Sequence, residues 1–158
     1  MASLPFQWVP GDTAFWLDGT VAFNRRYYYR IRAFDEAGNR SPHSEPVDYM
    51  LLSKLIPVSP RGKIIPERVP QFTFMWGDDP LGISHFVVKL VNDSEHSIWI
   101  SEPNHVAGYG HPGSVLYNAD GRAKSDSLAS GSYLWRIDAI GAEERSGSES
   151  RWVSFSVR

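Results

Sequence analysis

The chain has 158 residues, 42% hydrophobic, 22% charged and 13% aromatic, which is enough for a globular protein with a buried core. Its formal net charge of −2 excludes the basic field that attracts nucleic acid or anionic lipid, and the lack of cysteine excludes disulfides and thiolate metal sites. No apolar run approaches the roughly 18 residues of a membrane span, and residues 1–5 show no signal-peptide pattern.

The first predicted strand runs from Tyr27 to Ala33. Tyr27, Tyr29 and Ile31 fall on one face of it, and this period of two is typical of a half-buried strand. Residues 35–39 form a turn in which Gly38 suits a positive φ. A returning strand is predicted over residues 47–52.

Four prolines lie between residues 53 and 70, among basic and apolar residues. Proline cannot donate to a sheet ladder, so this composition predicts a semi-rigid connector that leads into an edge-type first strand of the next unit.

The second half of the chain predicts an all-β sandwich, because short alternating segments recur at intervals of about 8–12 residues with turns between them. The expected strands are 71–76, 86–90, 98–100, 114–117, 133–139 and 152–157. In the first of these, Phe72, Phe74 and Trp76 face inward. Residues 102–113 are predicted to be a loop.

Two segments of the chain repeat one another. Tyr27-x-Tyr29-Arg30-Ile31-x-Ala33 matches Tyr133-x-Trp135-Arg136-Ile137-x-Ala139, and each segment is followed by an Arg-Ser pair. The offset between them is 133 − 27 = 106 residues, about one sandwich domain plus a connector. The spacing predicts tandem domains.

At these residues the chain resembles the fibronectin type III family. Residues 26–47 are similar to the family's strand F, its turn and the start of strand G, and Leu128-x-x-Gly131-x-Tyr133 is similar to the turn with its corner tyrosine. The resemblance implies structural roles for Tyr27 and Tyr133, whose hydroxyls bond back to the nearby backbone. It also places Trp76 and Trp135 in the core.

Residues 53–158 are therefore expected to form a complete fibronectin type III-like antiparallel β-sandwich, with residues 1–52 as the last strands of a truncated sister domain. Half a sandwich exposes an apolar inner face. Three explanations stay open: the chain is a fragment, which we favour; the face packs on the second unit; or a homodimer covers it.

The sequence predicts no catalytic, metal or cofactor site, and hence no enzyme. His105 and His111 share a Gly-rich loop but lack further ligands at metal-site spacing. The acidic pairs Asp78-Asp79 and Glu143-Glu144 are adjacent in turns, not opposed across a cleft as glycoside hydrolysis requires.

Three aromatic residues are candidates for ligand contact. Trp99 lies opposite in phase to Ile98 and Ile100, so it faces outward if those two are buried. With Tyr109 and Tyr117 it would form a flat patch for a sugar ring or a protein partner. The competing interpretation is that Trp99 covers a sheet edge or packs on the connector.

The function expected from this pattern is a non-catalytic interaction or spacer module, binding a protein partner or a polysaccharide. Resemblance to bacterial surface proteins with paired sandwiches implies an extracytoplasmic location. The alternative is a carbohydrate-binding accessory domain of a secreted polysaccharide-degrading enzyme.

Overall fold

The computed structural model describes residues 18–105 and 112–158, and within them it contains twelve strands and no helix. No helix in this described part could therefore cross a membrane. The strands are β1 (Arg26–Tyr29), β2 (Val47–Leu51), β3 (Ile56–Ser59), β4 (Ile64–Ile65), β5 (Gln71–Met75), β6 (Ile83–Asn92), β7 (Ser97–Ile100), β8 (Asn104–His105), β9 (Gly113–Leu116), β10 (Gly131–Gly141), β11 (Ser146–Glu149) and β12 (Val153–Val157).

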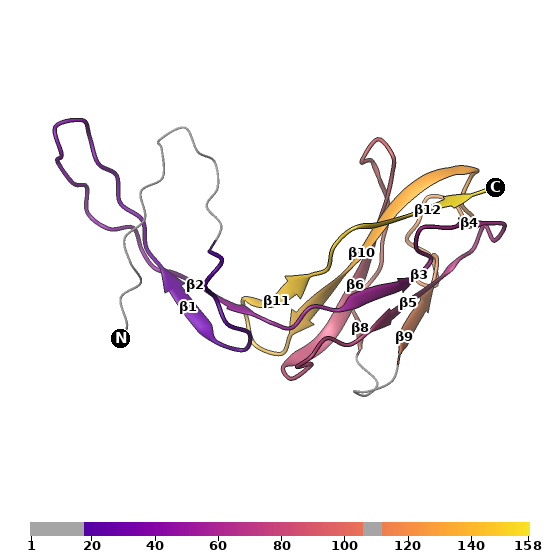
Figure 1. Ribbon diagram of the computed structural model, residues 1–158, viewed down its shortest axis with the longest axis horizontal. Coiled ribbons are helices and arrows are strands. Elements are labelled where there is room, and N and C mark those ends of the chain that lie inside the picture. The colour runs from indigo at the N-terminus through magenta and orange to yellow at the C-terminus, as the bar shows by residue number, and fades with distance from the viewer. Residues whose placement is uncertain (1–17, 106–111) are drawn as a thin grey trace.

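Two sheets face one another in a sandwich, as predicted (Figure 1). One has three strands in the order β3-β5-β9. The other centres on β10, which pairs with β6 along one edge and with β11 and then β12 along the other. β7 and β8 pair in turn with the outer edge of β6. This larger sheet continues through β11 into β2 and β1, giving nine strands in all.

The core lies between the sheets and follows the predicted alternation. Phe72 and Phe74 of β5 are fully buried, and they face Val88, Leu90 and Trp135 from β6 and β10. The rings of Phe72 and Trp135 lie 4.9 Å apart. Aromatic and aliphatic side chains share this core, and burial of their apolar surface drives folding.

Trp76 lies one residue beyond β5 and is half-buried, packed against the core with its ring edge-on to Phe74 at 5.8 Å. Trp76 therefore contacts the core from its margin instead of lying inside it on a strand.

The proline-rich lead-in is part of the sandwich. Its first strand, β3, is an edge strand paired with β5, as expected from its prolines. The chain then crosses to the other sheet, where β4 runs parallel to β12. Leu52 and Leu55 are fully buried in the core, and the Trp135 Nε1 donates a 2.6 Å hydrogen bond to the carbonyl of Pro60. Residues 52–60 therefore anchor the fold.

Tyr133 forms the hydrogen bond to the upstream backbone that the resemblance implies. Its hydroxyl donates to the carbonyl of Ala129 at 2.9 Å, four residues upstream, while the buried ring stacks on Phe155. Tyr27 behaves differently: its ring is half-buried, and its hydroxyl accepts a 3.0 Å bond from the backbone N–H of Ala22. Both hydroxyls fix the chain just upstream of a strand.

The N-terminal arm, defined here as residues 18–51, is a two-stranded ribbon that projects from the sandwich (Figure 1). Its first strand ends at Tyr29, four residues before the predicted end, and beyond it an isolated bridge joins Phe34 to Arg40. Gly38, at φ 82°, occupies the turn as expected.

Candidate functional site

The predicted outward position of Trp99 is wrong. The residue is 2% exposed, because β7 pairs with β6 in a register that sets Trp99 opposite the fully buried Leu90. Ile98 is half-buried, whereas Ile100 is 48% exposed. The premise that both isoleucines are buried therefore fails, and the larger ring takes the inner face.

Tyr117 is equally unavailable to a ligand. It is 2% exposed, its ring meets that of Trp99 edge-on at 5.5 Å, and its hydroxyl donates to the carbonyl of Ser125. Tyr109 lies outside the described residues. The Trp99–Tyr117 pair thus belongs to the core.

Asp120 holds this aromatic pair in place. Its Oδ1 accepts a 2.9 Å bond from the Trp99 Nε1, and its Oδ2 accepts a 2.7 Å bond from the backbone N–H of Glu102. Burial raises the pKa of the carboxyl group, but the hydrogen bonds from Glu102, Trp99 and Arg122 outweigh it and hold the pKa below its usual value. The turn at residues 118–121 is thereby tied to the end of β7.

Replacing Asp120 with alanine is expected to lower the free energy of unfolding by about 1–3 kcal/mol, because the buried indole N–H of Trp99 loses its acceptor. Urea unfolding followed by circular dichroism measures the loss. Asp120→Asn, which keeps an amide oxygen for Trp99, should cost less. Equal stability of Asp120→Ala and the wild type would contradict the anchoring role.

Histidines and acidic residues were the other candidates for chemistry. In residues 18–105 and 112–158, no group of three or more His, Cys, Asp or Glu side chains could hold a metal. The rings of His85 and His105 lie 4.4 Å apart across β6 and β8. Of the predicted acidic pairs, Asp79 accepts a 2.6 Å hydrogen bond from the side chain of Asn24, and Glu143 forms an ion pair with Arg26. Asn24 and Arg26 both belong to the arm.

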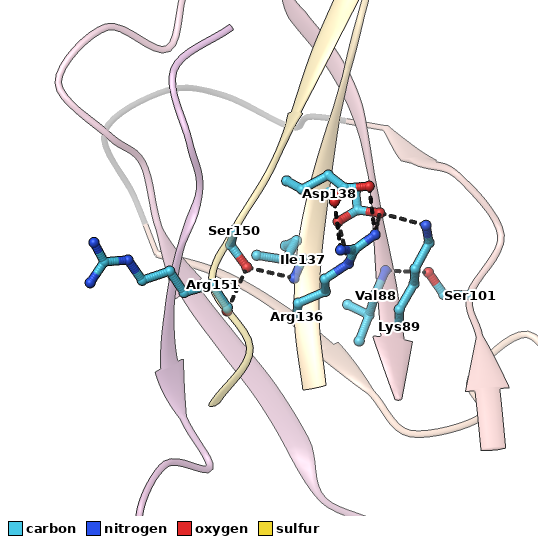
Figure 2. A network of polar contacts seen from close by, with 9 residues as sticks. Val88, Lys89, Ser101, Arg136, Ile137, Asp138, Ser150 and Arg151 are labelled. Carbon is cyan, nitrogen blue, oxygen red and sulfur yellow. Dashed lines mark hydrogen bonds and ion pairs between the residues drawn. The ribbon is translucent and has the colours of Figure 1, made fainter. Parts of the chain in front are cut away.

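The outer face of the larger sheet carries a charge-balanced cluster, of which Figure 2 shows Lys89, Arg136 and Asp138. Asp138 forms ion pairs with Lys89 at 2.8 Å and with Arg136 at 3.1 Å. Arg136 also binds both carboxylate oxygens of Glu149 at 2.6 Å and stacks over the ring of Trp152. Two cations and two anions thus balance one another in charge on this face, which ties β6, β10 and β11 together.

Two buried serines accept hydrogen bonds from backbone N–H groups of the central strands β6 and β10, at the points where the neighbouring strands β7 and β11 end. Ser101 follows β7, and its hydroxyl accepts from the backbone N–H of Val88 at 3.0 Å; Ser150 follows β11, and its hydroxyl accepts from Ile137 at 3.0 Å (Figure 2). Both hydroxyls donate in turn to the next carbonyl. Central backbone donors therefore stay paired at both breaks.

The joint between the arm and the sandwich is the candidate functional site. β2 runs parallel to β11, with Met50 beside Ser146 and Leu51 beside Gly147. The N–H of Met50 donates to the carbonyl of Arg145 at 2.9 Å, and the N–H of Leu52 donates to that of Gly147 at 3.0 Å. The larger sheet is thus continuous from the arm into the sandwich.

Gly147 permits this close pairing. A Cβ at this position would lie 2.6 Å from the carbonyl oxygen of Ala139 and 3.2 Å from the hydroxyl of Tyr49. The first contact is with backbone and cannot be relieved by a side-chain rotation. A side chain here would push β11 away from its neighbours.

Four charged side chains surround the joint. Arg26 pairs with Asp48 and, at 2.9 Å, with Glu143, while Arg145 binds the other oxygen of Asp48 at 2.9 Å. Hydrogen bonding to Arg26, then to Arg145, lowers the pKa of Asp48. The bond to Glu143, then that to Asp48, raises the pKa of Arg26. Residues distant in sequence are thereby tied across the joint.

Sequence reasoning missed this site because β11 has the sequence Ser-Gly-Ser-Glu, which shows no apolar alternation. One available signal was the Arg-Ser pair of the internal repeat, since Arg145 and Ser146 are both residues of the joint.

No protein-family model matches the chain, and no curated protein matches it. Among solved structures, the chain is similar to the dimeric latent PorU from Porphyromonas gingivalis, at 16% sequence identity and a TM-score of 0.48. The match covers 84% of this chain and spans 12% of the PorU chain.

Proposed function

We propose that this chain is a non-catalytic spacer and interaction module, fibronectin type III-like, within an exported bacterial multidomain protein. One observation carries the proposal: backbone pairing joins β2 to β11, and ion pairs join the arm to the turn before β11, so the sheet runs without a break from one unit into the next. Such a joint suits a module that holds neighbouring units at a fixed angle.

The strand arrangement supports the family assignment within this proposal. Apart from the arm and the two-residue strands β4 and β8, three strands (β3, β5, β9) face four strand positions formed by β7, β6, β10 and the broken pair β11/β12. Seven positions in two antiparallel sheets are typical of sandwiches of this type, and so is the hydroxyl bond of Tyr133.

The alternative of a carbohydrate-binding accessory domain loses its proposed stacking surface, since Trp99 and Tyr117 are buried. The exposed Trp152 has one guanidinium over its ring. A stacking platform for sugar rings needs an open aromatic face. We therefore favour the spacer.

The fixed angle can be measured by spin-label distances. Because the chain has no cysteine, Glu45→Cys and Asp93→Cys supply the only attachment points, one before β2 and one in the exposed β6–β7 turn. A rigid joint should give a distance distribution as narrow as that of a control pair within the sandwich, Asp93→Cys with Ser154→Cys. A distribution much broader than the control would refute the spacer function.

A further inference from the structure

Two histidines face each other on neighbouring strands of the larger sheet. His85 of β6 pairs directly with His105 of β8, and their ring centres lie 4.4 Å apart. Phe86, the next residue of β6, is buried in the core, so both imidazoles project from the opposite, outer face. His85 is half-buried and His105 is exposed. The pair is therefore open to solvent from one side.

A β-bulge places a hydroxyl group beside one of these rings. β6 and β10 pair regularly as far as His85, which lies opposite Ile140, and the next pair skips Ser84. The Ser84 Oγ lies 3.0 Å from the His85 Nδ1 and 3.2 Å from the carbonyl oxygen of Ile140. Bulges re-aim side chains in this way, and they are over-represented next to active sites.

These two hydrogen bonds determine which nitrogen of His85 carries its proton. A carbonyl oxygen can only accept, so the single hydroxyl proton of Ser84 is donated to Ile140. The Ser84 oxygen must then accept from the Nδ1–H of His85. In the neutral ring this leaves the lone pair on Nε2. A histidine that donates one ring N–H to an acceptor and keeps the other nitrogen free has the usual arrangement of a metal ligand.

The acidic group nearby on this face is already engaged. Asp138 lies opposite Val87, two residues along β6 from His85. Its carboxylate forms ion pairs with Lys89 and Arg136. The ligands that this face offers are therefore the two imidazoles.

We propose that His85 and His105 bind a divalent transition-metal ion, with Zn²⁺ as the type case, between β6 and β8. Imidazole suits zinc, copper and nickel, whereas Mg²⁺ and Ca²⁺ require oxygen ligands. A tetrahedral zinc ion with Zn–N bonds of about 2.0–2.1 Å holds two nitrogens about 3.4 Å apart, which is compatible with the spacing of these rings. Water completes the coordination. The sequence spacing did not predict the site, because the two histidines lie on different strands.

A bound ion would clamp β8 onto the sheet. This strand has two residues, and its pairing with β6 consists of the histidine pair and the pair of Phe86 with Asn104. An ion that bridges the strands adds a cross-link at this weak edge and stabilises the folded chain by mass action. The inference goes beyond the proposed spacer function and does not depend on it.

Calorimetric titration of the intact chain with ZnCl₂ tests the inference. We expect one ion per chain, bound at least about tenfold more weakly in His85→Gln and in His105→Gln. Ser84→Ala keeps both ligands but removes the acceptor of the Nδ1 proton, and it should weaken binding by less than the loss of either ligand. His96→Gln replaces an exposed histidine of the β6–β7 turn and is the matched control, which should bind like the wild type. MgCl₂ should give no binding.

Two further measurements make the result decisive. Zn²⁺ should raise the midpoint of thermal unfolding of the wild type and of His96→Gln, but not of the double variant His85→Gln/His105→Gln. In nuclear magnetic resonance spectra of the wild type, the Nε2 resonance of His85 should shift on addition of ZnCl₂, which requires no variant. Equal zinc affinity in the wild type and the double variant, an equal loss in His96→Gln, or ring resonances unchanged at saturating ZnCl₂ would each overturn the inference.

Discussion

Replacing Trp135 with alanine is expected to lower the free energy of unfolding by about 3–5 kcal/mol. The side chain is fully buried between the sheets, its ring packs on Phe72 at 4.9 Å, and its Nε1 donates to the carbonyl of Pro60. The variant removes the largest volume at the centre of the core and leaves that carbonyl without its donor. Urea unfolding should be followed by circular dichroism, since the substitution removes a fluorophore.

Two variants make this measurement specific. Trp135→Phe keeps a core ring but loses the bond to Pro60, and should cost about 1–3 kcal/mol. Trp152→Ala removes a tryptophan that is 41% exposed and stacked on Arg136, and should cost at most about 1 kcal/mol. A loss for Trp135→Ala no larger than that for Trp152→Ala would show that the core does not depend on this residue.

Acid is expected to loosen the joint through Asp48. Because Arg26 and Arg145 lower the pKa of Asp48 beneath its ordinary value of 3.8, the carboxylate stabilises the folded joint. This contribution is complete above the ordinary value and is lost as the pH falls through the lowered one. The distance distribution between labels at positions 45 and 93 should therefore be narrow at neutral pH and broaden only as the pH falls below the ordinary value of 3.8.

Asp48→Asn tests the assignment of this acid response. The amide cannot neutralise Arg26 and Arg145. The distance distribution between the two labels in this variant should therefore already be broad at neutral pH and change little on acidification. Glu36→Gln alters an exposed carboxylate that forms no ion pair with residues 18–105 or 112–158, and it should keep the wild-type response. A narrow distribution in Asp48→Asn across the pH range would remove Asp48 from the mechanism of the joint.

The sandwich was predictable where alternation was long and one face was clearly apolar. β10 is the clearest case: Tyr133, Trp135, Ile137 and Ala139 are all buried, and their spacing leaves one register with an apolar inner face. The hydroxyl bond of Tyr133 follows from the same turn that the sequence predicts.

Trp99 could not be placed in this way. Its strand is short, and both of its faces are apolar, so alternation alone does not say which face is buried. The pairing with Leu90 and the hydrogen bond to Asp120 decide it, and both involve residues distant along the chain.

The sequence pattern did not predict the joint, for a related reason. Its pairing links Met50 and Leu51 to Ser146 and Gly147, almost a hundred residues away, through small polar side chains that carry no strand signal. Its ion pairs likewise join Arg26 to Glu143. A local sequence pattern predicts individual strands, whereas this pairing depends on which strands become neighbours in the folded sheet.

The placement of Leu52 determines how the gene can be divided. This residue follows directly on β2 yet is fully buried in the sandwich core, and β2 also covers the open edge of β11. A sandwich transplanted from Ser53 onward would lose a core side chain and expose unpaired backbone that invites aggregation. Recombination would therefore need to carry β2 along with the sandwich, so the unit of inheritance is longer than the sandwich itself.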